Sequence, residues 1–179
     1  MNILILGGNG QLGRRLVGAL LAADHDVTCL ARGTEPIPAG VNFIRADRDV
    51  PGSLEPVAGA YWDVIVDVAT QPGRVHRAVA ELQSRHWIYI SSVSAYLRGD
   101  VLEQDEDADL YEPLSADTIT DISEYGSAKV ACENAVRSTS VNATIIRPGL
   151  IAGAGDDTGR SGYYPWRFAQ GGEKCSRAR

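Results

Sequence analysis

The stretch LGGNGQLG, from Leu6 to Gly13, constrains the fold of this chain more than any other feature. It stands between a continuous apolar run, Asn2–Leu6, and a segment with apolar residues at helical spacing, Gln11–Ala23. This order predicts a buried parallel strand that turns sharply into a helix. Glycines allow the tight turn, and they let a pyrophosphate approach the backbone N–H groups at the helix N-terminus. The stretch therefore predicts a dinucleotide-binding turn.

The glycines of this turn fit two spacings. Gly8, Gly10 and Gly13 form G-x-G-x-x-G, the general dinucleotide fingerprint. Gly7, Gly10 and Gly13 form G-x-x-G-x-x-G instead. The turn by itself leaves both open.

The rest of the chain alternates short apolar strands with helical stretches. Further strands are expected over 26–31, 41–46, 63–69, 86–91 and 142–147, and helices over 74–83 and 123–138. Ser123 is expected to be the N-cap of the last helix. Strands joined through helices require right-handed crossovers, which predicts an α/β fold: a Rossmann-like doubly wound parallel sheet with helices on both faces. We expect a dinucleotide-binding domain over 1–155 and a truncated or minimal substrate-side tail over 156–179.

Composition and charge disfavour several classes of protein. A chain of 179 residues is long enough for one domain with a real core. Its formal net charge of -6 gives no basic footprint for nucleic acid. No apolar run approaches the length of a membrane span. We expect a cytoplasmic protein with neither nucleic-acid nor membrane partners.

Neither the cysteines nor the acidic residues form a metal-binding pattern. Cys29, Cys132 and Cys175 are scattered, and the first two fall within a predicted strand and a predicted helix. We expect these two to be buried or inert thiols rather than disulfides. The acidic stretch 99–112 lacks the internal glycine of a calcium loop, so a solvated loop is favoured over a metal site.

The end of the second predicted strand bears on the choice of dinucleotide. Arg32 stands at its tip, nineteen positions after Gly13. An acidic residue near this position accepts the ribose 2′-hydroxyl of NAD, whereas an arginine accommodates the 2′-phosphate of NADP. Arg32 therefore favours NADP(H). The alternative is that Glu35 takes the ribose and that NAD(H) is used.

A tyrosine and a lysine share one face of the helix predicted over 123–138. Tyr125 and Lys129 are four residues apart, so both can project into one pocket. A tyrosine with a pKa of about 10 is a poor proton-transfer catalyst at neutral pH. A neighbouring cation stabilises the phenolate and lowers that pKa. The pair predicts acid–base chemistry.

Together these residues resemble the short-chain dehydrogenase/reductase superfamily, and most closely its extended and atypical branches, which include NAD(P)-dependent epimerases and dehydratases. The resemblance covers residues 2–155. Those branches use G-x-x-G-x-x-G, which selects Gly7, Gly10 and Gly13 and makes Gly8 a permissive turn residue. The resemblance implies a set of cofactor-binding residues: Gly7, Asn9, Gly10, Gln11, Leu12, Gly13, Arg32, Asp47, Val68, Ala69, Tyr125, Lys129 and Pro148.

The resemblance also implies catalytic roles. Tyr125 would exchange a proton with a substrate hydroxyl or carbonyl while hydride moves to or from the nicotinamide. Lys129 would lower the pKa of Tyr125 and hydrogen-bond the nicotinamide ribose. Ser92, in ISSVSAY, would hold the substrate oxygen; strand alternation puts it on one side with Ser94, and it is preferred over Ser91 and Ser94.

The substrate is not readable from the sequence. Related extended enzymes continue well past the sixth strand, whereas thirty residues follow Gly149 here. The segment RSGYYPWRF, residues 160–168, is either the start of a substrate-side segment or an aromatic loop packed on the core. The leading hypothesis is an NAD(P)-dependent oxidoreductase, epimerase or dehydratase acting on a small molecule, with a nucleotide sugar as one candidate and a homodimer left open. A catalytically silent NADP(H)-binding sensor is the alternative, and an RNA-binding relative is disfavoured by the acidic charge.

Overall fold

A computed structural model describes residues 1–8, 10–34, 36, 38–153 and 162–171. Six parallel strands form one sheet in the order β3-β2-β1-β4-β5-β6. Their bounds are β1 Asn2–Leu6, β2 Asp26–Ala31, β3 Asn42–Arg45, β4 Tyr61–Asp67, β5 Gln83–Ile90 and β6 Asn142–Ile146. The α-helices are α1 Gln11–Ala22, α2 Glu55–Ala58, α3 Pro72–Glu81, α4 Tyr125–Arg137 and α5 Tyr163–Ala169, with short 3₁₀ turns η1 Val93–Ala95 and η2 Ile122–Glu124.

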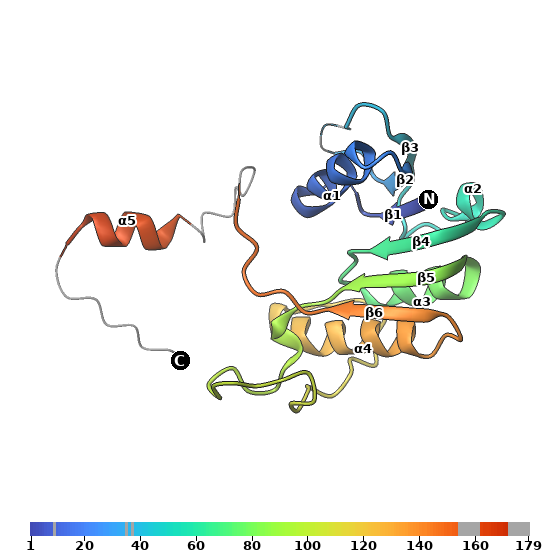
Figure 1. The fold of residues 1–179 in the computed structure, drawn as a ribbon. Helices are drawn as coiled ribbons and strands as arrows, with labels where there is room; N and C mark the ends of the chain where they lie inside the picture. Colours follow the sequence, from blue (N-terminus) through green and yellow to red (C-terminus); the bar gives the residue numbers. More distant parts are fainter. Residues whose placement is uncertain (9, 35, 37, 154–161, 172–179) are drawn as a thin grey trace.

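The strand order confirms the predicted doubly wound fold. The chain runs outward from β1 to β3 and then returns to build β4, β5 and β6 on the other side of β1. The strand order therefore reverses between β1 and β4, and a crevice opens there at the carboxyl ends of the strands. In Figure 1 the arrowheads of β4, β5 and β6 all point to this edge.

The apolar run of β1 is buried on both faces of the sheet. Leu4 and Leu6 belong to the larger core cluster, which α3 and α4 complete. Ile3 and Ile5 belong to a second cluster with Val17 of α1 on the opposite face. Helices therefore cover both faces, as predicted, and a strand between them must be apolar throughout.

Element boundaries differ from the predictions by a few residues, and one cap is different. Ser123 is not the N-cap of the predicted helix, because α4 begins at Tyr125 and η2 precedes it. The cap of η2 is Asp121, whose carboxylate accepts from the Ser123 backbone N–H at 2.8 Å. Glu124 completes a capping box, which satisfies the free N–H groups of this turn more fully than a lone serine would.

The aromatic segment near the C-terminus forms a helix rather than a loop. Helix α5 carries Tyr163, Tyr164, Trp166 and Phe168, all more than half exposed. Figure 1 shows α5 standing apart from the sheet. The expectation of an aromatic loop packed on the core is therefore wrong for the described part of this segment. Arg160 and the tail over 172–179, including Cys175, lie outside the described residues.

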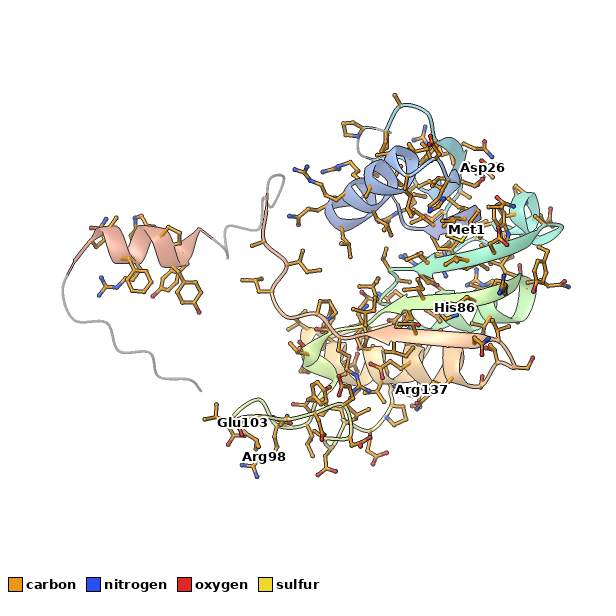
Figure 2. All side chains as sticks on the ribbon, viewed as in Figure 1. Met1, Asp26, His86, Arg98, Glu103 and Arg137 are labelled. Carbon is orange, nitrogen blue, oxygen red and sulfur yellow. The ribbon has the colours of Figure 1, made fainter. Side chains whose placement is uncertain are left out.

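The acidic stretch forms a long exposed connection between η1 and η2. Figure 2 shows Arg98 and Glu103 on this connection, which projects beyond one end of α4. Arg98 pairs with Asp100 in an exposed ion pair. Within the described ranges, no three His, Cys, Asp or Glu residues gather to hold a metal ion. Across the same ranges, no helix has the length and apolarity to cross a membrane.

Candidate functional site

The glycine turn is shaped by close contacts between backbone segments. Gly7 has φ +96°, a conformation that disfavours side chains, and a Cβ there would lie 2.6 Å from Cγ2 of Val68. A Cβ on Gly13 would lie 2.5 Å from Cα of Gly8. The first turn of α1 therefore packs directly against the end of β1, and two of the three predicted positions require glycine on steric grounds alone.

Gly8 differs from the role expected of it, and Gly10 differs from Gly7 and Gly13 in its surroundings. A Cβ on Gly8 would lie 2.5 Å from Sγ of Cys29, so Gly8 is required by packing against β2 and is not merely permissive. A Cβ on Gly10 would meet only the Gly7 carbonyl oxygen, at 3.9 Å. The protein itself leaves room for a side chain at Gly10. The missing side chain instead keeps the adjoining cavities open where a phosphate would approach the start of α1.

One cavity of about 330 Å³ lies on the β2 side of the crevice. It is lined by the turn, by the ends of β1, β2 and β4, and by three arginines: Leu6, Gly7, Gly10, Leu30, Ala31, Arg32, Thr34, Ala46, Asp47, Arg48, Val68, Ala69, Thr70, Gln71 and Arg74. This cavity therefore brings together Arg32 and Asp47, two of the residues predicted to bind the cofactor. Asp47 also caps its own loop by accepting from the backbone N–H of Asp49 at 3.1 Å.

A second cavity, of about 620 Å³, lies on the β5 side. It is lined by the glycine turn, the ends of β5 and β6, and the start of α4: Gly7, Gly10, Gln11, Leu12, Gly13, Val68, Thr70, Ile90, Ser91, Ser92, Val93, Ser94, Ile122, Tyr125, Lys129, Pro148, Gly149, Leu150 and Ile151. The two cavities share Gly7, Gly10, Val68 and Thr70, so they adjoin at the turn. All predicted site residues among the described ones line one or both; Asn9 lies outside the described residues.

Lys129 is buried and held by backbone carbonyls. Its side chain is 3% exposed, and its Nζ donates to the carbonyl oxygens of Ala69 at 3.0 Å and Ile90 at 2.9 Å. The Nζ atom lies 5.9 Å from the ring centroid of Tyr125. Burial lowers the pKa of the Lys129 ammonium. The predicted pair thus shares one face of α4 and one cavity.

The three serines after β5 have different surroundings. Strand β5 ends at Ile90, so the expected strand alternation of Ser92 and Ser94 does not apply. Ser92 is the N-cap of η1, and its hydroxyl accepts from the backbone N–H of Ser94 at 3.1 Å. The Ser91 hydroxyl instead donates to the carboxylate of Glu133. Both serines line the second cavity, but the Ser92 hydroxyl is bonded within its own turn, whereas the Ser91 hydroxyl is bonded to a buried carboxylate.

Glu133 is a residue that sequence reasoning missed. It follows Lys129 by one helical turn and is fully buried. Its carboxylate accepts a bidentate pair from Arg147 at 2.9 and 2.7 Å, and Arg137 lies 3.0 Å away. These contacts join α4 to the ends of β5 and β6. The four-residue spacing after Tyr125 and Lys129 is the signal that could have identified it.

Sequence reasoning also missed an ion pair between Arg48 and Asp67, beside the cavity on the β2 side. Arg48 donates two bonds of 2.8 Å to the carboxylate of Asp67, which is fully buried at the end of β4. The same carboxylate accepts from the backbone N–H of Ala69 at 2.9 Å. Arg74 lines this cavity as well and pairs with Asp49 on its rim. The loops after β3 and β4 are thereby tied together around the cavity.

Comparison with known proteins gives a consistent result. Residues 7–178 match a family described as NAD(P)H-binding. The chain is 30% identical over 168 residues to 2'-dehydrokanamycin reductase of Streptomyces kanamyceticus, a match that covers 88% of this chain and 45% of the reductase. It is 28% identical to the chloroplast stem-loop binding protein of 41 kDa b of Arabidopsis thaliana, over 84% of this chain and 42% of that protein.

Solved structures share the fold. An epimerase-like protein of Burkholderia cenocepacia superposes with a TM-score of 0.69 at 20% identity, over 87% of this chain and 56% of its own. The Bordetella bronchiseptica enzyme WbmG, solved with NAD and UDP, gives a TM-score of 0.63 at 20% identity. That match covers 82% of this chain and 52% of WbmG. The chain thus spans about half the length of these relatives. It belongs to the NAD(P)H-binding family, and it shares its fold with these solved structures.

Proposed function

We propose that the chain binds NADP(H) across the two cavities and catalyses proton-coupled oxidation or reduction of a carbonyl or hydroxyl group. One observation carries the proposal: the glycine turn, Ser92, Tyr125 and Lys129 line a single cavity. The open space at Gly10 fits a pyrophosphate at the N-terminus of α1, where backbone N–H groups and the helix dipole favour negative charge. When bound, the nicotinamide would donate or accept the hydride.

Three residues of the second cavity have separate roles in the proposed reaction. Tyr125 exchanges the proton with the substrate oxygen, and the hydroxyl of Ser92 donates to the same oxygen and orients it. Lys129 supplies positive charge beside the phenol and has one N–H beyond the two held by carbonyls. That N–H is available for the nicotinamide ribose.

Arg32 supports the choice of NADP(H) over NAD(H). Arg32 lines the cavity on the β2 side, where its guanidinium would pair with a 2′-phosphate. Asp47, which lines the same cavity, is assigned to the adenine. NAD-bound relatives show that a nicotinamide cofactor fits this fold, and the direct comparison of NADPH with NADH decides the preference.

The substrate is proposed only by chemical class. Relatives include a reductase of an aminoglycoside and proteins solved with UDP or UDP-glucose. We take a sugar carrying a ketone or a secondary alcohol as the substrate class, and a nucleotide sugar is one member of that class. The substrate panel should therefore contain free sugars, nucleotide sugars and simple ketones.

The test begins with fluorescence titration of NADPH and NADH, followed by that substrate panel. Replacing Tyr125 with Phe should lower kcat by about 10²- to 10⁴-fold, because the proton donor is lost. The Kd for NADPH should change little, since the ring remains. Tyr61→Phe is the matched control, because Tyr61 is exposed at the start of β4. Cofactor binding without any rate that depends on Tyr125 would favour the silent sensor, and tight binding of a stem-loop RNA would favour the RNA-binding alternative.

A further inference from the structure

Ala69 has both of its backbone polar groups held by buried side chains. Its N–H donates to Asp67 at 2.9 Å, and its carbonyl oxygen accepts from the Tyr89 hydroxyl at 2.8 Å. The same carbonyl oxygen accepts from Lys129 Nζ at 3.0 Å. A carbonyl has two lone pairs, so both acceptor positions of Ala69 are filled.

Tyr89 is placed for this contact by the sheet. Its Cα is the register partner of Asp67 across β4 and β5, so the two side chains leave the same face. Tyr89 is fully buried, and its ring centroid lies 5.0 Å from Lys129 Nζ. The phenol thus contacts the ammonium in two ways: its ring faces the cation, and its hydroxyl fixes the carbonyl that binds the cation.

We infer that Tyr89 is a positioning residue for Lys129. Its hydroxyl locks the Ala69 carbonyl in the orientation that holds the ammonium, which leaves the remaining N–H of Lys129 directed at the cofactor cavity. Tyr89 does not line either cavity, so it acts through Lys129 and does not touch substrate or cofactor. The expected effect of Tyr89 on cofactor binding rests on the proposed function. The contacts of Tyr89 with Ala69 and Lys129 can be tested without substrate.

The composition provides a direct probe. The chain has two lysines, Lys129 and Lys174, so protein labelled with ¹⁵N-lysine contains two side-chain ammonium groups. The variant Lys129→Arg assigns the signals by removing one. Proton exchange between the Lys129 ammonium and water then measures how firmly its hydrogen bonds hold it.

Tyr89→Phe keeps the ring and removes only the hydroxyl. We expect proton exchange at Lys129 to become at least about fivefold faster, the change that corresponds to loss of one ordinary hydrogen bond. We also expect the Kd for NADPH to rise by about the same factor, because the ribose donor is less well oriented. Tyr61→Phe, at an exposed tyrosine, should change neither quantity.

Unchanged proton exchange at Lys129 in folded Tyr89→Phe protein would overturn the inference. If that variant does not fold, the exchange of the Tyr89 hydroxyl proton with water can be measured in wild-type protein labelled with ζ-¹³C-tyrosine. A hydroxyl that donates a hydrogen bond exchanges slowly with water. Fast exchange of the Tyr89 hydroxyl would then overturn it, and slow exchange would support it. Failure of the wild-type chain to bind NADPH would contradict the proposed function, while the exchange at Lys129 would still judge the role of Tyr89.

Discussion

The glycine turn and the α4 side of the site are held in place by different forces. In the turn, backbone lies against backbone, so that a Cβ on Gly13 would lie 2.5 Å from Gly8. Around α4, buried charges are held by ion pairs and carbonyls, as Glu133 is by Arg147. The first arrangement depends on shape and should be insensitive to pH, whereas the second depends on ionisation. The two sides of the site should therefore be separable by experiment.

The largest effect is expected on the α4 side. Glu133→Ala leaves the Arg147 guanidinium, 9% exposed, without its carboxylate partner. Breaking a buried pair in this way should lower the free energy of unfolding by about 3–5 kcal/mol. Urea denaturation at neutral pH measures this loss. Asp100→Ala, which breaks the exposed pair with Arg98, is the control and should change the free energy of unfolding far less, because solvent screens that pair.

The same carboxylate predicts a dependence on pH. Burial alone would raise the pKa of Glu133, but Arg147 and the Ser91 hydroxyl hold it below its usual value of 4.5. A pKa lowered by folding adds stability that is present above the unfolded pKa and is lost as pH falls through the folded one. The stability difference between wild type and Glu133→Gln should therefore shrink as pH falls below 4.5. A difference that stays constant down to acid unfolding would contradict the assignment.

A smaller effect is expected in the glycine turn. Gly13→Ala should lower the free energy of unfolding by about 3 kcal/mol, because the added methyl overlaps the backbone of Gly8. The loss should be the same across neutral and mildly acidic pH. Gly18→Ala lies in the same helix with nothing within 4 Å of the added Cβ. It should be neutral or stabilise by up to about 1 kcal/mol, and equal losses in the two variants would refute the packing argument.

The smallest effect is expected at Arg32, on the rim of the cavity on the β2 side. Arg32→Ala should raise the Kd for NADPH by about tenfold, because one charge-assisted contact to the 2′-phosphate is lost. The Kd for NADH should change by less than about twofold, since NADH lacks that phosphate. Fluorescence titration of both dinucleotides measures the ratio. Equal losses for the two would mean that Arg32 does not select NADP(H).

Features that depend on neighbouring residues could be predicted from the sequence. The apolar run of β1 and the turn after it are local, and both were placed correctly. The i,i+4 spacing of Tyr125 and Lys129 likewise put both on one face of α4. Helix α5 was not predicted: the segment 160–168 was expected to be either the start of a substrate-side segment or an aromatic loop packed on the core. Proline is tolerated in the first turn of a helix, and Pro165 is the third residue of α5.

Features that join distant segments could not be predicted in this way. Glu133 contacts Ser91, which is 42 residues away, and Arg147, which is 14 residues away. Arg48 and Asp67 meet only because β3 and β4 end at the same edge of the sheet. The requirement at Gly8 depends on Cys29 of the neighbouring strand. In each case a residue acquires its role from a partner that only the folded sheet brings near.

The contact between Gly8 and Cys29 has a practical consequence. Burial raises the pKa of the Cys29 thiol to about 11, so little reactive thiolate exists at neutral pH. Cys29 is buried next to Gly8, so a thiol reagent should reach its sulfur when the glycine turn lifts away from β2. The rate of alkylation at Cys29, followed by peptide mass mapping, therefore reports how often the turn opens. A dinucleotide bound at the turn should slow the alkylation of Cys29. The alkylation rate of the native chain would therefore report cofactor binding without an added label.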